Sequence, residues 1–445
     1  MLYDELLLDL QSKFSAIEDT RRKYNQKYSL KNILLSGFSL FSLKDSSLLS
    51  YVQQYRERKA NLKSVYGITQ CPSDSGLRTI LDDVEPSALQ SILPSYVQLL
   101  AENGHLDSFL LDFSNKSDIS DKGSKKSNLD GYLLIPIDGV QYFSSSEVNC
   151  ACCLQKKHKN GSTTYHHNAL TAVIAHPDLP QVLVVASEEI KKQDGQKKND
   201  HELVAATRLM PMIKQAIGAR KAIIGGDSLF ANAPFIRLLI SQNFNFLFSI
   251  KEGYQGYPFI QFNQLSQEGK TKIWRQKDAK HEYHYEFVNN LILNGQNQDI
   301  KVNFIRFKQT NIKTGEILTM EWITDIPLSI CNINTVVKAG RARWKIENET
   351  FNTLKNQGYH YDHNFGHGKK YLAQNLAQLM LIAFMFDQIQ QLLSPLFNKA
   401  LLICKSKKIL WIKVREIIDL VPVINMESVY KIITKESKLK IEIIV

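Results

Sequence analysis

The chain is poor in cysteine, glycine and proline, and it has no long uninterrupted apolar run. Six cysteines among 445 residues do not make the disulfide framework of a small secreted domain. The 21 glycines and 12 prolines exclude a collagen-like or linker-dominated chain. The longest apolar stretch, residues 376–386, is shorter than the roughly 20 residues that cross a bilayer. The first ten residues include three acids, whereas a secretory signal begins with positive charge. We therefore expect a reduced, cytoplasmic protein without a membrane segment.

The balance of charge is basic. Lys and Arg number 55, and Asp and Glu number 44, so the net charge is +11. Such an excess favours a polyanionic partner such as nucleic acid. A length of 445 residues allows about two to four domains at roughly 100–200 residues each.

Hydrophobic spacing predicts helices at the start of the chain and an α/β region after them. Residues 1–113 have apolar side chains at three- and four-residue steps, which is typical of amphipathic helices. The polar stretch of residues 114–128 is the best candidate for a linker. Short apolar runs at residues 132–137 and 221–225 predict buried strands, with a helix at residues 202–217 between them. Strands and helices in this order favour an α/β layered sheet.

The second half of the chain interrupts this alternation and then resumes it. Residues 252–331 are rich in aromatic and β-branched side chains with Gly and Asn turns, which predicts an inserted antiparallel β region. We expect helices at residues 336–356 and 370–393, the first capped by Asn334 or Thr335. In this interpretation the final segment, residues 396–445, is a basic C-terminal tail.

Two aspartates follow predicted buried strands. Asp138 comes after Leu-Ile-Pro-Ile, and Asp227 comes after Ala-Ile-Ile-Gly-Gly. Ligand and metal sites gather at strand ends in α/β sheets. The alternative for each aspartate, taken singly, is an ordinary Asp-Gly or Gly-Gly-Asp turn.

A third acid, Glu347, lies within the apolar stripe of the predicted helix 336–356. At about 100° per residue, it projects between Phe351 and Leu354, whereas Glu349 projects to the polar side. An acid in an apolar stripe needs a partner or a metal ion, because an isolated buried charge is costly. The simpler alternative is an ion pair with Arg343, one turn earlier.

Three converging carboxylates, those of Asp138, Asp227 and Glu347, could together hold two divalent cations. Hard cations such as Mg²⁺ prefer oxygen ligands. Two of them about 4 Å apart can activate a water or a 3′-hydroxyl at a phosphodiester and stabilise the leaving oxygen. Such chemistry suits a basic protein with a nucleic-acid partner.

Three stretches carry a resemblance to a known family: residues 135–139, 223–230 and 341–355. They resemble the DDE transposases of bacterial insertion sequences, the class with a β-rich insertion inside an RNase H-like catalytic domain. This class has the signature Tyr-x2-Arg-x3-Glu-x6-Lys. Arg343 and Glu347 fit the signature, Gly340 takes the tyrosine position, and the lysine comes one residue late, at Lys355.

The resemblance implies an α/β protein with an RNase H-like mixed-sheet core that catalyses metal-dependent transposition. Water would attack at a transposon end, and the freed 3′-hydroxyl would then attack target DNA. Two Mg²⁺ (or Mn²⁺) ions would be bound by the catalytic triad of Asp138, Asp227 and Glu347. The residues in contact with DNA would be Arg341, Arg343 and Lys355.

The same resemblance assigns the regions of the chain and its partner. Residues 1–113 would be a helical domain that binds transposon ends, residues 130–251 and 332–395 the catalytic core, and residues 252–331 the β-rich insertion. The partner would be double-stranded DNA, bound by a homodimer, with the protein at the nucleoid when bound. Two alternatives stay open. One is a catalytically inactive, sequence-specific DNA-binding protein of the same fold, and the other is an unrelated carboxylate enzyme such as a glycosidase.

A cysteine pair raises the question of a second metal site. Cys150 and Cys153 form a C-x2-C step with His158, His166 and His167 after it, and such residues occur in Cys₂His₂ zinc sites. The spacing of a standard zinc finger is absent, however. Zinc is therefore not expected, and buried free thiols are the simpler interpretation.

Two other groups of polar residues remain without an assigned role. Asp194, Asp200 and Glu202 form a weak reserve of acidic ligands near the centre of the chain. A His-rich loop follows the predicted helix 336–356 and contains His360, His363 and His367. This loop could clamp DNA or brace the active site, although structural histidines are the commoner case.

Overall fold

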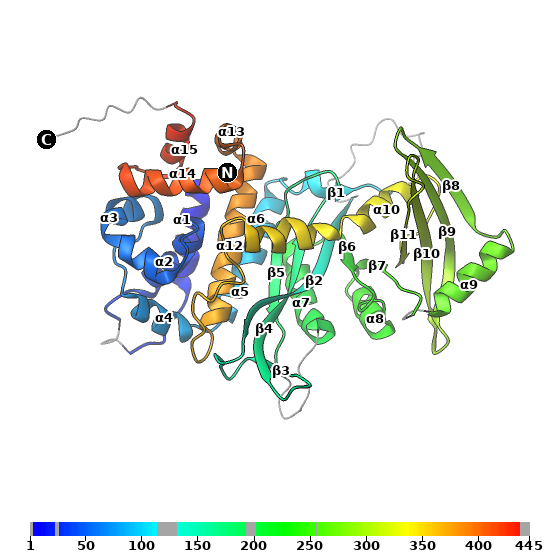
Figure 1. The fold of residues 1–445 in the computed structure, drawn as a ribbon, viewed down its shortest axis with the longest axis horizontal. Coiled ribbons are helices and arrows are strands. Elements are labelled where there is room, and N and C mark those ends of the chain that lie inside the picture. Colours follow the sequence, from blue (N-terminus) through cyan, green and yellow to red (C-terminus); the bar gives the residue numbers. More distant parts are fainter. Residues whose placement is uncertain (1–2, 23–25, 114–130, 193–201, 254–255, 437–445) are drawn as a thin grey trace.

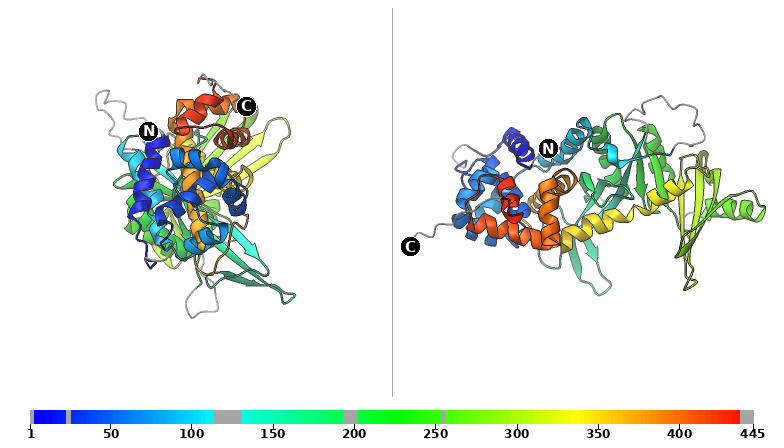
Figure 2. Two further views of the ribbon diagram at one scale, coloured as in Figure 1. Left: turned by 90° about the vertical axis from the view of Figure 1, so that its left-hand side faces the viewer. Right: turned by 90° about the horizontal axis from the view of Figure 1, so that it is seen from above.

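The helices from the two ends of the chain gather on one side of the molecule, and the sheet occupies the other side (Figure 1). The computed structural model describes residues 3–22, 26–113, 131–192, 202–253 and 256–436. Seen from above, the helical part, the core strands and the inserted strands follow one another along an elongated molecule (Figure 2). The linker expected at residues 114–128 lies outside the described residues.

Six helices form the region before the first long strand, as the spacing of apolar residues predicted. Three of them begin at serine N-caps, because the side chains of Ser29, Ser47 and Ser73 accept hydrogen bonds from backbone N–H groups. Such caps satisfy donors that have no partner inside the helix. The helices are α1 (Tyr3–Ala16), α2 (Leu30–Ser42), α3 (Leu48–Tyr66), α4 (Asp74–Asp82), α5 (Ser87–Gln90) and α6 (Ile92–Glu102).

The C-terminal helices pack on the N-terminal ones. The described part of the segment expected as a basic tail forms three helices. The buried guanidinium of Arg58 on α3 bonds both Asp45 and Asp419. The rings of Phe38 and Phe386 meet at 4.9 Å between centroids. Residues far apart in the sequence therefore share one helical core. The helices are α12 (Leu372–Leu393), α13 (Pro395–Cys404), α14 (Lys407–Leu420) and α15 (Met426–Ile433).

Among the described residues, α12 is the one helix that is long and apolar enough to cross a membrane. In this structure 78% of its most apolar window is buried inside the protein. The helix passes between the helical part and the sheet (Figure 1), so its apolar character is accounted for by packing on both sides.

A mixed sheet of eleven strands runs through the molecule. In its core, β2 pairs antiparallel with β4 and parallel with β6, and β6 pairs parallel with β7. Since β5 pairs with β4, the core order is β5-β4-β2-β6-β7, which confirms the α/β class. The core strands are β1 (Leu110–Leu111), β2 (Tyr132–Ser145), β3 (Leu154–Lys157), β4 (Thr163–Ile174), β5 (Leu183–Glu189), β6 (Lys221–Gly226) and β7 (Asn245–Ser249).

Two helices connect these strands. Helix α7 (Glu202–Ile217) has the predicted bounds and leads into β6. Helix α8 (Ala233–Ser241) begins after Asn232, whose side chain accepts a hydrogen bond from the Phe235 backbone N–H. The strand-helix alternation therefore follows the prediction in this part of the chain.

The inserted β region extends the core sheet. Strand β11 pairs antiparallel with β7, with Trp322 opposite Ser249, and the order continues through β10 and β9 to β8. The region also contains a helix, α9 (Gly256–Gln267), which the prediction of strands alone did not include. The strands are β8 (Lys272–Lys277), β9 (His281–Asn294), β10 (Asn297–Asn311) and β11 (Ile317–Thr324).

The helix expected at residues 336–356 is not continuous. Its parts are α10 (Ile333–Arg341), a π-helical stretch at Ile346–Asn352, and α11 (Thr353–Asn356). Its N-cap is Asn332, without a side-chain cap hydrogen bond, so the predicted caps were wrong. A π-helix is wider than an α-helix, so a projection at about 100° per residue fails across it. Trp344 is 45% exposed rather than buried in an apolar stripe.

Candidate active site

The register of the sheet places Asp138 and Asp227 at equivalent positions. The parallel pairing of β2 with β6 ends at Pro136 opposite Gly225, and each aspartate follows two residues later. Neighbouring strands lie about 4.8 Å apart, so both aspartates lie at the edge where this parallel pairing ends. Strand β2 itself continues to Ser145 and pairs Asp138 with Thr171 of β4, so the expectation that the strand ends at Asp138 was wrong. Asp227 has already left its strand, and its Oδ1 accepts a hydrogen bond from the Leu229 backbone N–H at 2.9 Å.

An arginine joins Asp138 to Glu347. Nη1 of Arg343 lies 3.1 Å from Asp138 Oδ2 and 2.7 Å from Glu347 Oε1. The side chain of Glu347 is 50% exposed, so the expectation of a buried acid was wrong, although the expected pair with Arg343 is present. Glu347 nevertheless lies on the side of Asp138, whereas the charge of Glu349 acts on Lys345.

A fourth acid, Glu202, lies against the two aspartates. It begins α7, and a Cβ added to Gly139 would come within 2.3 Å of its Oε1. The backbone beside Asp138 therefore has room for the Glu202 carboxylate only because residue 139 is glycine. Of the weak reserve of acids in the sequence, Asp194 and Asp200 lie outside the described residues, and Glu202 is the one that the structure brings to the site.

The electrostatics of this group of acids show an excess of negative charge. The pKa of Asp138 is raised to about 7, mainly by burial; the Arg343 guanidinium lowers this pKa and the Glu347 carboxylate raises it. Burial and the nearby charge of Asp227 also raise the pKa of Glu202. Carboxyl groups crowded in this way hold protons more tightly until a cation neutralises them. One guanidinium does not balance four carboxylates.

The donor set suits a hard divalent cation. Asp138, Asp227, Glu347 and Glu202 offer oxygen atoms only, which Mg²⁺ and Mn²⁺ prefer, and their charge is not compensated by Arg343 alone. Within the described residues, the three predicted triad acids do not form a group with all ligand oxygens within 4.8 Å of one another. Arg343 occupies the space between two of them. The oxygen ligands are therefore of the kind that a divalent cation prefers. In this structure the Arg343 guanidinium lies between Asp138 and Glu347 and supplies the positive charge there.

A cleft opens beside the acids. Its volume is about 610 Å³, and Arg341, Arg343 and Trp344 line it together with the end of β7 and part of β11. A second cavity, of about 650 Å³, lies among α1, α4 and α6. None of the four acids lines either cavity, and the first is next to them because Arg343 lines it. Exposed acids next to a cleft with arginines are open to a large anionic substrate.

The predicted DNA contacts are at different distances from the acids. Arg343 is at the site itself, whereas Nη1 of Arg341 is 3.1 Å from Gln309 Oε1 of the inserted strand β10. Lys355 is half-buried on α11. At the signature's tyrosine position, a Cβ added to Gly340 would come within 2.7 Å of Nε1 of Trp322. No tyrosine fits there, because the indole fills the space.

A comparison with protein families identifies the family of this chain. The model of the transposase DDE domain matches residues 155–385, which is more than half of the 445 residues. The chain belongs to this transposase family. The matched range includes Asp227 and Glu347 and begins after Asp138. The mixed sheet is thus the RNase H-like core of a DDE transposase domain, and DNA is its partner. A comparison with curated proteins found no match.

The structure also brings together residues that the sequence left apart. Cys150, Cys153, His167 and His367 place their ligand atoms within 4.8 Å of one another. We call these four residues the Cys–His cluster. His167 was noted as a nearby histidine and His367 as part of a loop, and nothing in their spacing joined them. By contrast, Nε2 of His158 lies 3.0 Å from Thr164 Oγ1, outside the cluster.

Proposed function

We propose that this transposase cleaves phosphodiester bonds at the ends of its transposon and then joins those ends to target DNA. Both reactions require bound divalent cations. The observation that supports this most is the shared arginine, because it brings Asp138 and Glu347, 209 positions apart in the sequence, to one guanidinium. The sheet register adds Asp227 at the same edge. Water attacks the phosphorus and a 3′-oxygen leaves. The freed 3′-hydroxyl then attacks a phosphodiester of target DNA, a new P–O bond forms, and the 3′-oxygen of the target strand leaves.

The side chains have distinct roles in this proposal. Asp138, Asp227 and Glu347 bind two Mg²⁺ or Mn²⁺ ions, and Glu202 adds negative charge beside Gly139. When bound, such cations activate the attacking hydroxyl and stabilise the leaving oxygen. Arg343 neutralises Asp138 and Glu347 before the cations bind and is the nearest positive charge for a DNA phosphate.

The rest of the molecule supplies binding surface in the same proposal. Arg341 and Lys355 extend the positive charge away from the acids, along the segment that runs between the inserted strands and the helical part (Figure 2). Residues 1–113 bind the transposon ends, and a homodimer brings two ends together. The protein acts in the cytoplasm, at the nucleoid when bound. The competing function is sequence-specific DNA binding without cleavage.

The test uses the purified protein and DNA that carries its own flanking ends. We expect cleavage with Mg²⁺, none with chelator, and a loss of about a hundredfold or more in Asp227→Asn. Asparagine keeps the acceptor for the Leu229 N–H, so folding and DNA binding should remain. Binding without cleavage by the unaltered protein under all metal conditions would favour the competing function.

A further inference from the structure

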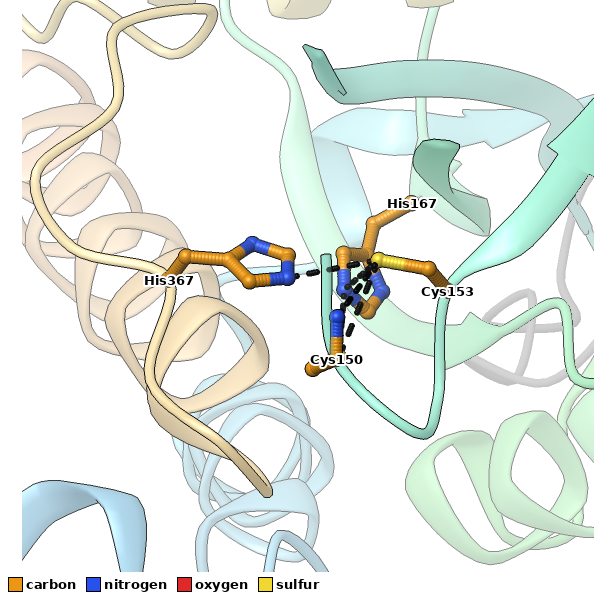
Figure 3. Close-up of side chains that lie close together, drawn as sticks. All are labelled: Cys150, Cys153, His167 and His367. Atoms are coloured by element: carbon orange, nitrogen blue, oxygen red, sulfur yellow. Dashed lines mark hydrogen bonds between the residues drawn. The ribbon is translucent and has the colours of Figure 1, made fainter. Parts of the chain in front are cut away.

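The Cys–His cluster joins three separate parts of the fold. Cys150 and Cys153 lie in the turn between β2 and β3, and His167 is on β4. His367 comes from the segment between α11 and α12. Figure 3 shows the two thiols and His167 on the strand side, with the His367 ring pointing toward them from across the gap.

Four of the six distances within the cluster match the edges of a tetrahedron around zinc, and the other two are within 4.8 Å. Zinc lies about 2.3 Å from sulfur and about 2.0–2.1 Å from nitrogen, so two sulfurs should be about 3.8 Å apart and a sulfur and a nitrogen about 3.5 Å apart. The two thiol sulfurs are 3.7 Å apart. Nε2 of His167 lies 3.4 Å from Cys150 Sγ and 3.5 Å from Cys153 Sγ, and Nε2 of His367 lies 3.3 Å from Cys153 Sγ.

A carboxylate fixes the orientation of one imidazole. Nδ1 of His167 lies 2.8 Å from Glu189 Oε1, and since a carboxylate only accepts, Nδ1 carries the proton. Nε2 is then the ring nitrogen that faces the two sulfurs and can bind a metal ion. Glu189 is itself held, because its Oε2 accepts a hydrogen bond from the Tyr142 hydroxyl at 2.8 Å. Metal-binding histidines in proteins are commonly supported by a carboxylate in this way.

The other histidine, His367, is positioned both through its ring and through the backbone around it. Its ring stacks on Phe143, with 4.2 Å between centroids. The carbonyl of Phe365 accepts a hydrogen bond from Arg78 Nη1, and the N–H of Lys369 donates to Asp82. Helix α4 therefore positions the backbone around His367 independently of the cluster.

The cluster is largely closed to solvent. Cys153 is fully buried, His167 and His367 are 2% and 6% exposed, and Cys150 is half-buried. A catalytic zinc keeps a position for water, whereas a structural zinc has four protein ligands. We propose that Cys150, Cys153, His167 and His367 bind one structural zinc ion.

This zinc links the parts that carry the catalytic acids. Strand β2 contributes both Asp138 and Phe143, and His367 follows Glu347 by 20 positions in the sequence. A bond network from the β2–β3 turn and β4 to His367 limits how far the segment after Glu347 can move from the strand of Asp138. Zinc is therefore a positioning element here and makes no contact with the reacting atoms.

The first test is the metal content of the unaltered protein, expressed with added zinc and purified under reducing conditions without chelator. We expect about one zinc per chain. Cobalt(II) in its place should give the intense visible absorption and the thiolate charge-transfer band of a tetrahedral site with sulfur ligands. Less than about a tenth of an equivalent of zinc would overturn the proposal. An intact mass lower by two hydrogens in unreduced protein would show a disulfide instead and would also overturn it.

Variants locate the ion. Cys153→Ser and His367→Asn should lose zinc and melt at a lower temperature, by about 5 °C or more. Cys152→Ser is the matched control, since Cys152 lies between the ligands in the chain but outside the cluster, and it should keep both zinc and melting temperature. Stoichiometric zinc in both ligand variants would overturn the assignment, whatever their activity. Brief Mg²⁺ depletion should stop cleavage without removing this ion, which separates the proposal from the function of the acids.

Discussion

The carboxylate site and the Cys–His cluster differ in exposure and in completeness. The acids are open, with half of the Glu347 side chain exposed, and their charge is not balanced by Arg343 alone. Three of the four cluster residues are buried, and four of its six ligand distances already match a tetrahedral ion. An open site with excess charge suits cations that enter with a substrate, whereas a closed and complete site suits an ion that stays. Strand β2 contains Asp138 and leads into the turn that contains Cys150 and Cys153, so it connects the two sites.

The sharpest way to test this difference is a change that removes one charge from the open site. In Glu347→Gln the size and shape are kept, but the negative charge that binds a cation is lost. We expect DNA cleavage to fall by about a hundredfold or more. The melting temperature should stay close to that of the unaltered protein, because the exposed pair with Arg343 contributes little to stability. Cleavage rate and melting temperature should be measured on the same preparation.

A matched control sits two residues away. Glu349→Gln removes the same charge from the same π-helical stretch, yet Glu349 acts on Lys345 rather than on the aspartates. This variant should cleave at nearly the normal rate. An unstable Glu347→Gln protein that still cleaves would show that the acid is a structural partner of Arg343, and the active-site assignment of Glu347 would be lost.

The pH dependence of cation binding is the next largest effect. Because burial and Glu347 raise the pKa of Asp138 to about 7, protons compete with a cation for this carboxylate at lower pH. We expect the affinity for Mn²⁺, measured by titration without DNA, to fall about tenfold between pH 8 and pH 6. Zinc content of the Cys–His cluster serves as the internal comparison and should stay constant over this range.

The same raised pKa sets the sign of a stability effect. A carboxyl group whose pKa is higher in the folded state stabilises the fold while protonated, and this contribution is lost as the pH rises through about 7. The contribution of Asp138 should therefore make the metal-free protein melt at a lower temperature at pH 8 than at pH 6. In Glu202→Gln, a negative charge that raises the pKa of Asp138 is removed. The pH dependence of Mn²⁺ affinity and that of the melting temperature should therefore both move to lower pH. A flat Mn²⁺ affinity from pH 8 to pH 6 would remove Asp138 from the ligands.

Much of the core fold was predictable because it depends on local patterns. The short apolar runs before Asp138 and Asp227 fall in strands β2 and β6, although β2 continues past Asp138 to Ser145. Helix α7 begins and ends where its periodicity predicted. The projection of Glu347 failed for a physical reason, since the π-helical stretch at Ile346–Asn352 does not advance at the angle of an α-helix. Helix α9 was also missed, because its aromatic residues resemble those of the strands that follow it.

The Cys–His cluster was not predictable because it is made by tertiary contacts. Cys150 and Cys153 gave a recognisable step, but the fourth ligand lies 214 positions beyond Cys153. The expectation of no zinc depended on the absence of a second histidine at finger spacing. The fold supplies that histidine from the segment between α11 and α12, so the reason for the expectation no longer holds. The outer carboxylate of Glu189 likewise comes from another strand, without any local signal.

The smallest expected effect concerns binding alone. Lys355 is a half-buried cation on α11, after the π-helical stretch, and among the described residues it forms no ion pair closer than 4.0 Å. If it contacts a DNA phosphate, Lys355→Ala should lower the slope of log affinity against log salt by about 0.9, the counterion release of one contact. The loss of affinity should be several-fold at low salt and smaller at high salt.

Arg343→Ala should show the same change of slope and a larger loss of DNA affinity than Lys355→Ala, because two carboxylates near the DNA then lose their neutralising partner. Lys399→Ala is the control, since Lys399 pairs with Glu436 among the C-terminal helices, and its slope should not change. The measurement needs chelator to prevent cleavage. It therefore reports the electrostatic contribution to DNA binding and not the rate of cleavage. A Lys355→Ala slope equal to that of the unaltered protein would place this lysine outside the DNA path and confine the positive surface to Arg341 and Arg343.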